Sequence, residues 1–337
     1  MHLVLTLPGL LAQDRAVRAP CLAPLLAIAG PPSRDADGLD AMLAAHYGIV
    51  HARDSDCPLA PVRLAALGVD PGAAFWLAAN PVTLVAGRDD VRLTGIARDL
   101  DAGEASALVA VLNAHFATDG IAFVAPRPDA WFVRAPANIA LRTRPVATVV
   151  GRTLRDLLPT GTDAGTWRRW QSEVQMLLHE HPVNAARERD DRAPVNSVWF
   201  SEGGMLPPRS SASHVVSTFS DDGTAIALAA WANRPSFAVP ATLGPALLTG
   251  GDASAIVVAL SPLHDVDAVE RDWATPAWTA LAGGTLKTVT ILADDGERAL
   301  EWTAAMPGFA QRIALRFARS DLAPLLAASL ERDGEDA

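Results

Sequence analysis

The sequence predicts an α/β protein of two domains: a sheet covered by helices on both faces, and a smaller inserted α+β unit. Three observations support this prediction. The chain has 337 residues, more than one hydrophobic core usually serves. Apolar runs of strand length alternate with helical patterns near both ends, as expected of a sheet buried on both faces. From Phe75 the pattern changes to hairpin-like strands. The predicted division is a discontinuous core of residues 1–74 and 195–330, an inserted domain of residues 75–194, and an acidic tail, 331–337.

The N-terminal part of the core should contain one strand and three helices. His2–Leu7 is a β-prone run that stops at Pro8-Gly9, a turn signal. Apolar positions at helical spacing follow it, and a glycine stands after each of these segments. The predicted helices are 22–28, 39–47 and 62–67.

The inserted domain should combine short strands with two helices. Residues 76–86 and 91–94 indicate a hairpin, and Asp101 is a cap for a helix that extends to about Phe116. A second amphipathic helix starts near Thr162-Asp163, and Pro182 should end or bend it. The remaining predicted strands of this domain are 121–124, 130–133 and 139–142.

The C-terminal part of the core returns to apolar runs separated by helical or polar segments. Each run has the length of a strand buried on both faces. A last helix is predicted at 322–330. The predicted strands are 195–200, 225–230, 255–260, 286–292 and 313–317.

Composition excludes several classes of function. A net charge of −10 argues against a protein that binds a phosphate backbone. No apolar run approaches the length that crosses a bilayer, so no membrane partner is expected. Two unpatterned cysteines, Cys21 and Cys57, do not form a disulfide scaffold or a zinc site. The sequence therefore predicts a cytoplasmic protein.

The stretch from Trp167 to Gly204 is the densest in aromatic and polar side chains, and it gives one candidate site. His181, Asn184, Arg187 and Asn196 could bind an anion, because an Arg fork and Asn amides suit a carboxylate or a phosphate. The alternative is that the two Asn satisfy backbone groups at a domain junction. The sequence favours the second interpretation and leaves both open.

A second candidate site consists of acidic turns that follow two apolar runs. The carboxyl ends of such strands are where α/β proteins place ligands, and acidic side chains there could hold a hard cation. Acidic turns are also common in a chain this negative, so ordinary turns remain the favoured interpretation. The candidate metal ligands are His264, Asp265, Asp267, Asp294 and Asp295.

The segment from Leu178 to Gly204, with its His-Pro-Val-Asn element, later Arg, second Asn, Trp-containing strand and Gly pair, resembles a known block. It is similar to the archaeal-type cofactor-independent phosphoglycerate mutases, and more closely to the RpfE-type bacterial regulatory proteins. Weaker similarities lie at 19–25, 64–71 and 79–83. The resemblance implies an alkaline-phosphatase-like sheet with an inserted domain. In those mutases it also implies two divalent metals held by Asp and His, and a serine that carries the phosphoryl group.

The chain departs from this pattern at the positions of the metal ligands. Leu7-Pro8-Gly9 stands where an Asp-Gly is expected, and no Gly-Ser-Asp turn follows Gly68 at the expected spacing. At most Asp294 remains of a later Asp-His pair. Within the RpfE-type block, Asp190-Asp191 replaces an expected Arg-Gly and Ser201-Glu202 an expected Trp-Gly.

These departures predict a phosphoglycerate-mutase-like protein without the two-metal site, hence a non-catalytic regulatory protein with no cofactor. Its partner would be a phosphorylated small molecule or another protein. The alternative is a phosphoglycerate mutase or phosphatase with a divalent metal in a rearranged site. A third hypothesis is a structural protein that binds a partner through a Trp-rich surface.

Overall fold

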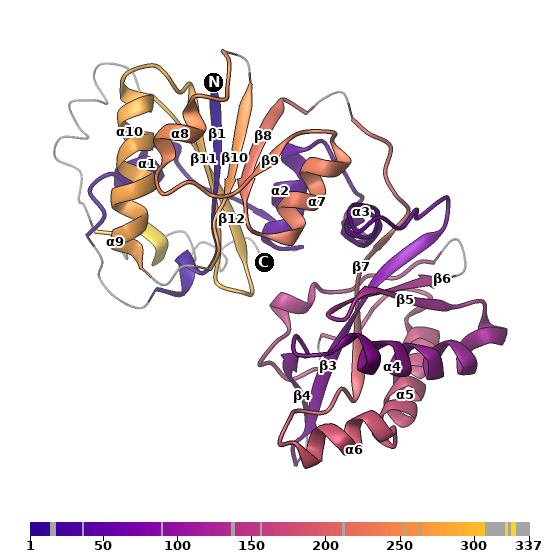
Figure 1. Ribbon diagram of the computed structural model, residues 1–337. Coiled ribbons are helices and arrows are strands. Elements are labelled where there is room, and N and C mark those ends of the chain that lie inside the picture. Colours follow the sequence, from indigo (N-terminus) through magenta and orange to yellow (C-terminus); the bar gives the residue numbers. More distant parts are fainter. Residues whose placement is uncertain are drawn as a thin grey trace. The chain divides into compact units, whose positions relative to one another are not determined.

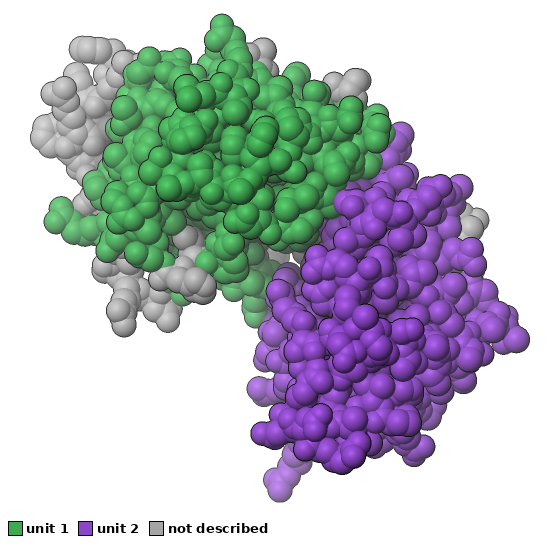
Figure 2. Space-filling model, viewed as in Figure 1, with its two compact units in different colours: residues 1–48, 209–337 green, residues 49–208 purple. Residues whose placement is uncertain are grey.

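The computed structural model of the protein describes residues 1–13, 18–35, 37–88, 90–135, 139–155, 157–210, 213–252, 254–262, 265–306, 321–322 and 325–327. The chain divides into two compact units (Figure 2). Unit 1 consists of residues 1–48 and 209–337, and unit 2 of residues 49–208. The α/β class predicted from the sequence is confirmed, since each unit combines a sheet with helices.

Unit 1 is built on a seven-stranded sheet in the order β2-β12-β11-β1-β10-β8-β9. Strand β1 lies at its centre and pairs in parallel with both β10 and β11 (Figure 1). Strands β8 and β9 continue the parallel part, whereas β12 and β2 add an antiparallel edge. The strand bounds are β1 His2–Leu7, β2 Ser33–Asp35, β8 Val215–Ser220, β9 Ser236–Phe237, β10 Ala255–Ala259, β11 Thr288–Asp294 and β12 Ala299–Ala305.

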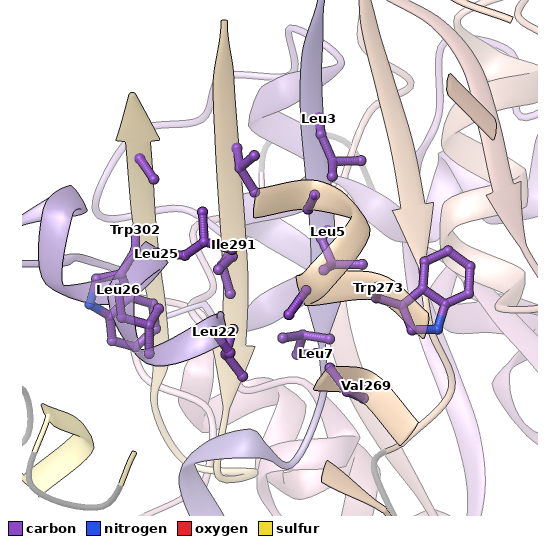
Figure 3. Close-up of a cluster of buried hydrophobic side chains, with 14 of the residues drawn as sticks. Leu3, Leu5, Leu7, Leu22, Leu25, Leu26, Val269, Trp273, Ile291 and Trp302 are labelled. Carbon is purple, nitrogen blue, oxygen red and sulfur yellow. The ribbon is translucent and has the colours of Figure 1, made fainter. Parts of the chain in front are cut away.

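Helices cover both faces of this sheet, so its strands are apolar on both sides. Leu3, Leu5 and Leu7 of β1 point into the main core, to which helices α1 and α10 also contribute (Figure 3). Val4 and Thr6 are buried on the opposite face. Helices α2 and α7 pack on that opposite face. The helix bounds are α1 Leu22–Ala29, α2 Leu39–His46, α7 Gly223–Trp231, α8 Leu243–Leu247, α9 Val266–Val269 and α10 Thr275–Ala282, with a π-helical turn at Glu270–Ala274.

Unit 2 contains a five-stranded antiparallel sheet around one long strand, β3. One edge of β3 pairs with β7, and the other pairs with β6 and then β4. Helices α4 and α5 cover one face of the sheet, and the core between them and the sheet is rich in aromatic side chains. Helix α3 packs on the other face. The bounds are α3 Leu59–Ala66, β3 Phe75–Ala86, β4 Val91–Ile96, α4 Ala102–His115, β5 Ala122–Arg127, β6 Ala130–Ala135, α5 Ala164–His179, α6 Pro182–Arg189 and β7 Ser197–Gly204.

The unit boundaries differ from those expected from the sequence. The segment 195–208 was assigned to the core, but its strand β7 pairs with β3 and belongs to unit 2. Residues 49–74 also belong to unit 2, where α3 contacts β3 and β7. An apolar run shows that a strand is buried but not which sheet buries it, and this is the physical reason for the error.

Some predicted elements also differ in type. Residues 225–230, predicted as a strand, lie in helix α7, because Asp222 caps this segment by accepting the N–H groups of Thr224 and Ala225. Strands β8 and β12 were not predicted. Of 139–142, only Arg142 forms an isolated bridge, to Thr160. The predicted strand 313–317 and the tail 331–337 lie outside the described residues, as does most of the predicted helix 322–330.

No helix within the described ranges is long and apolar enough to cross a membrane.

Candidate functional site

The four predicted ligand-binding side chains lie close along the chain in unit 2, and their polar groups contact the protein itself. His181 caps α6, since its Nδ1 accepts the N–H of Val183 at 3.2 Å. Burial lowers the pKa of His181, which favours the neutral ring that this contact requires.

Asn184 is 2% exposed and connects the end of α5 to the segment before β7. Its Nδ2 donates to the carbonyls of Leu178 at 2.6 Å and Val195 at 2.9 Å, and its Oδ1 accepts the N–H of Val195 at 2.8 Å. Asn196 does the same for β3: its Oδ1 accepts the N–H of Leu84 and its Nδ2 donates to the Leu84 carbonyl, each at 2.8 Å. Both amides therefore act as substitutes for backbone partners.

Arg187 is 1% exposed, and its guanidinium is divided among three partners. Its Nε donates to the carbonyl of Ala193 at 2.8 Å, Nη1 to Glu104 at 3.0 Å and Nη2 to Asp99 at 2.7 Å. Hydrogen bonds from Arg187 lower the pKa of Asp99. The two Asn thus bond to backbone groups, as in the second interpretation, but within unit 2 and not at a domain junction. Ligand binding by the four side chains stays a prediction.

The acidic turns of the second candidate site occupy the carboxyl edge of the unit 1 sheet, but their oxygens close turns and cap helices. Asp265 caps α9 by accepting the N–H groups of Asp267 and Ala268. Asp295 accepts the N–H groups of Glu297 and Arg298. His264 lies outside the described residues. In the part of the chain that the structure describes, no three His, Cys, Asp or Glu side chains are grouped to hold a metal.

Asp294 is the member of this set that lies within the sheet, at the end of β11 beside the end of β1. Its Oδ1 accepts the N–H of Gly9 at 2.7 Å. Burial raises the pKa of Asp294, the hydrogen bond from Gly9 opposes this shift, and the nearby charge of Asp295 adds to it. The two positions at which the resemblance expects metal ligands, the turn after β1 and Asp294, are therefore adjacent, but a backbone amide stands where a carboxylate is expected.

Another acidic residue accepts backbone N–H groups of the segment Ala19–Leu25, whose sequence also resembles a segment of the mutases. Glu270 accepts the N–H groups of Cys21 at 2.7 Å and Leu22 at 2.9 Å, at the start of α1. A carboxylate at a helix N-terminus is favourable because the free N–H groups carry partial positive charge. No local sequence pattern indicates this role, since 249 residues separate Glu270 from Cys21.

A buried polar cluster in unit 2, centred on Asp56, is a further feature that the sequence did not predict. The carboxylate of Asp56 accepts the N–H of Thr143 at 2.8 Å, the Thr143 hydroxyl, and the N–H of Gly203 at 3.1 Å. Burial raises the pKa of Asp56, and the hydrogen bonds from Thr143 are the largest opposing effect. Beside it, Glu202 is 6% exposed and pairs with Arg63 at 2.7 Å. The only sequence signal was a polar loop at 53–58, and no pattern indicated burial.

Two residues with positive φ stand where the resemblance expects glycine. Asp191 has φ 56° and Glu202 has φ 60°. Asp191 follows α6 in a Schellman arrangement, in which Arg192 N–H bonds to the Arg187 carbonyl and Asp191 N–H to that of Glu188. Glycine is the residue that such positions prefer, because it has no Cβ to clash. The backbone at both positions thus fits the block that the sequence resembles.

Comparison with known proteins gives similarity over part of the chain. No family model matches it. It is 28% identical over 164 residues to the 2,3-bisphosphoglycerate-independent phosphoglycerate mutase of Methanosarcina mazei, covering 43% of this chain and 41% of the relative. It is 26% identical over 153 residues to the same enzyme of Methanosarcina barkeri, covering 44% of this chain and 37% of the relative. The matched region spans about two fifths of the length of these curated relatives.

Two solved structures are similar over a larger share of the chain. The cofactor-independent phosphoglycerate mutase from Thermoplasma acidophilum matches with a TM-score of 0.41 and 15% identity, covering 90% of this chain and 89% of that one. The PH0037 protein from Pyrococcus horikoshii matches with a TM-score of 0.47 and 12% identity, covering 90% and 87%. The sequence matches support homology, in part of the chain, to the archaeal-type cofactor-independent phosphoglycerate mutases.

Proposed function

We propose that the protein is a phosphoglycerate-mutase-like regulatory protein that has lost the two-metal site. It belongs, in this proposal, with the RpfE-type proteins, acts in the cytoplasm without nucleic acid or membrane partners, and binds a phosphorylated small molecule or a protein. The observation that carries the proposal is the contact between Asp294 and the N–H of Gly9.

This contact bears on metal binding because a divalent metal needs several anionic or imidazole ligands around one point. The turn after β1 supplies no carboxylate, since it reads Leu7-Pro8-Gly9. Asp294, at the end of β11, accepts a neutral N–H donor from that same turn. These described groups support the proposal that the two-metal site of the mutases has been lost.

Loss of the metals removes the main source of catalysis in that reaction class. In-line phosphoryl transfer depends on cations that neutralise the charge of the transferred group. A chain with the scaffold and without the ligands can still bind a metabolite or a protein.

The proposal is tested by assays of the purified chain with phosphoglycerates and a phosphatase substrate, with and without added Mn²⁺ or Zn²⁺. We expect no turnover under either condition. Metal-dependent turnover would contradict the proposal and favour the second candidate, an enzyme with a rearranged site around Asp294. That candidate rests on the retention of one carboxylate at the end of β11.

The binding part of the proposal is tested separately by thermal shift with a panel of phosphorylated metabolites. We expect at least one compound to raise the melting temperature. An Arg187→Lys variant keeps the charge but not the fork, so an equal shift in this variant would remove Arg187 from the ligand contact. If no compound shifts the melting temperature, the small-ligand version of the proposal is wrong. Copurification of a specific protein would then support the partner version, and a monomer with no copurifying protein would end it.

A further inference from the structure

Two polar side chains are buried in unit 2 without a partner for one of their oxygen atoms. Ser201 of β7 is 0% exposed and Asn80 of β3 is 7% exposed. The Ser201 Oγ and the Asn80 Oδ1 are fully buried, and neither has a hydrogen-bond partner among the described residues. An unpaired buried oxygen is unfavourable, so two of them in one sheet require an explanation.

The register of the sheet places these side chains on one face and next to each other. Ala78 pairs with Ser201, and Asn80 pairs with Trp199, so Asn80 and Ser201 are diagonal neighbours across β3 and β7. Diagonal neighbours lie about 7 Å apart between Cα atoms, with their Cβ atoms somewhat closer. The side chains between them on this face, Ala78 and Trp199, are apolar where they contact the core.

The residues that follow Ser201 in β7 contact polar groups. The N–H of Glu202 donates to the Thr143 hydroxyl at 3.2 Å, and the N–H of Gly203 donates to the Asp56 carboxylate at 3.1 Å. The backbone next to Ser201 is thus hydrogen-bonded, whereas the Ser201 Oγ and the Asn80 Oδ1 are not. A buried polar position with two unsatisfied oxygens is the type of place that holds an internal water molecule.

We propose that Asn80 and Ser201 bind one internal water molecule that bridges β3 and β7. The water donates one hydrogen to Asn80 Oδ1 and bonds with the Ser201 hydroxyl as donor or acceptor. No charged or larger ligand fits the proposal, because the two contributing groups are neutral and almost fully buried. The bridge fixes the centre of the β3–β7 pair, where the resemblance expects a Trp at position 201 and the chain has the smaller Ser.

A crystal structure of the full chain tests the proposal directly. We expect an ordered water within about 2.6–3.2 Å of both oxygens. A direct hydrogen bond between Asn80 and Ser201, or a dry contact with no water at this position, would overturn it.

A double-mutant cycle adds a solution measurement that does not depend on the crystal. Ser201→Ala and Asn80→Leu should each raise the unfolding constant, and the cycle should show coupling of at least about tenfold. The matched control is Ser197→Ala, since Ser197 is the other buried diagonal neighbour of Asn80 on this face and its hydroxyl bonds to the Val198 carbonyl. Equal coupling at Ser197, or none at Ser201, would contradict the bridge.

Discussion

Two residues of unit 2 have a strained backbone. Asp191 and Glu202 hold left-handed conformations at positions where glycine is expected from the resemblance. A non-glycine residue there costs about 1 kcal/mol. Asp191 is exposed, whereas Glu202 is buried and pairs with Arg63. The same strain is therefore uncompensated at one position and offset by an ion pair at the other.

This contrast predicts opposite effects of the same substitution. Asp191→Gly should raise the free energy of unfolding by about 0.5–1 kcal/mol, because it relieves the strain at the end of α6. Glu202→Gly should lower it by about 2 kcal/mol, because Arg63 loses its buried partner. Urea denaturation of both variants provides the measurement. A gain in stability for both would show that the Arg63–Glu202 pair contributes nothing.

The carboxyl group of Asp294 predicts a pH dependence of stability. Its folded-state pKa is raised by burial, so the folded state binds more protons than the unfolded state between the two pKa values. Stability therefore falls as the pH rises through this window, from the ordinary aspartate value of about 3.9 to the folded pKa.

Asp294→Asn tests this prediction, because the amide Oδ1 can still accept the Gly9 N–H and does not titrate. The variant should match or exceed wild-type stability at neutral pH, by about 1 kcal/mol or less. Its advantage should grow as the pH rises through the window. Urea midpoints measured between about pH 4 and pH 7 give the comparison. A variant that follows the wild-type profile at every pH would assign the dependence to another group.

At the scale of elements, a cluster of four charges connects α6 to the start of α4. Arg187 and Arg192 both bond to Asp99 and Glu104, and Glu104 also completes the capping box of α4 with Asp101. Arg187 is almost fully buried, whereas Arg192 is partly exposed. Loss of Arg187 removes three hydrogen bonds from a buried position, whereas loss of Arg192 removes the contacts of a partly exposed side chain. In each variant the other Arg still pairs with Asp99 and Glu104.

Arg187→Ala should therefore cost about 2–3 kcal/mol of unfolding free energy, because charged hydrogen bonds are lost and the Ala193 carbonyl loses its donor. Arg192→Ala is the matched control and should cost about 1 kcal/mol or less. Chemical denaturation of the two variants measures the difference. Equal costs would mean that burial of Arg187 is not what makes its contacts important.

The sequence predicted elements well where a local signal was strong. The Asp101 cap indicated α4, and the apolar run at 2–7 indicated β1. The run 225–230 was wrong because alanine-rich apolar segments suit either type, and the cap at Asp222 decided for a helix. The membership of β7 in unit 2 could not be predicted, because strand pairing joins Ser197 to Val82 over a separation that no local pattern encodes.

At the scale of the whole molecule, the sequence identified groups of polar side chains and left two interpretations of each group open. Asn184 and Arg187 are central to unit 2, but as partners of backbone and carboxylate groups. The acidic turns are at the carboxyl edge of the unit 1 sheet, but as caps and turn closures. The same residue types serve ligands or the fold, and only geometry distinguishes these roles. The Asp56 cluster could not be predicted from the polar loop at 53–58, since Asp56, Thr143 and Gly203 come from three separate segments.

The central claim is that the phosphoglycerate-mutase-like scaffold of this chain no longer holds its metals. The most direct test is metal analysis of the protein after incubation with Mn²⁺ and Zn²⁺ and removal of free ions. Our account predicts no stoichiometric metal, and the same result for Asp294→Asn. Two equivalents of metal per chain in the wild type, lost in Asp294→Asn, would contradict it.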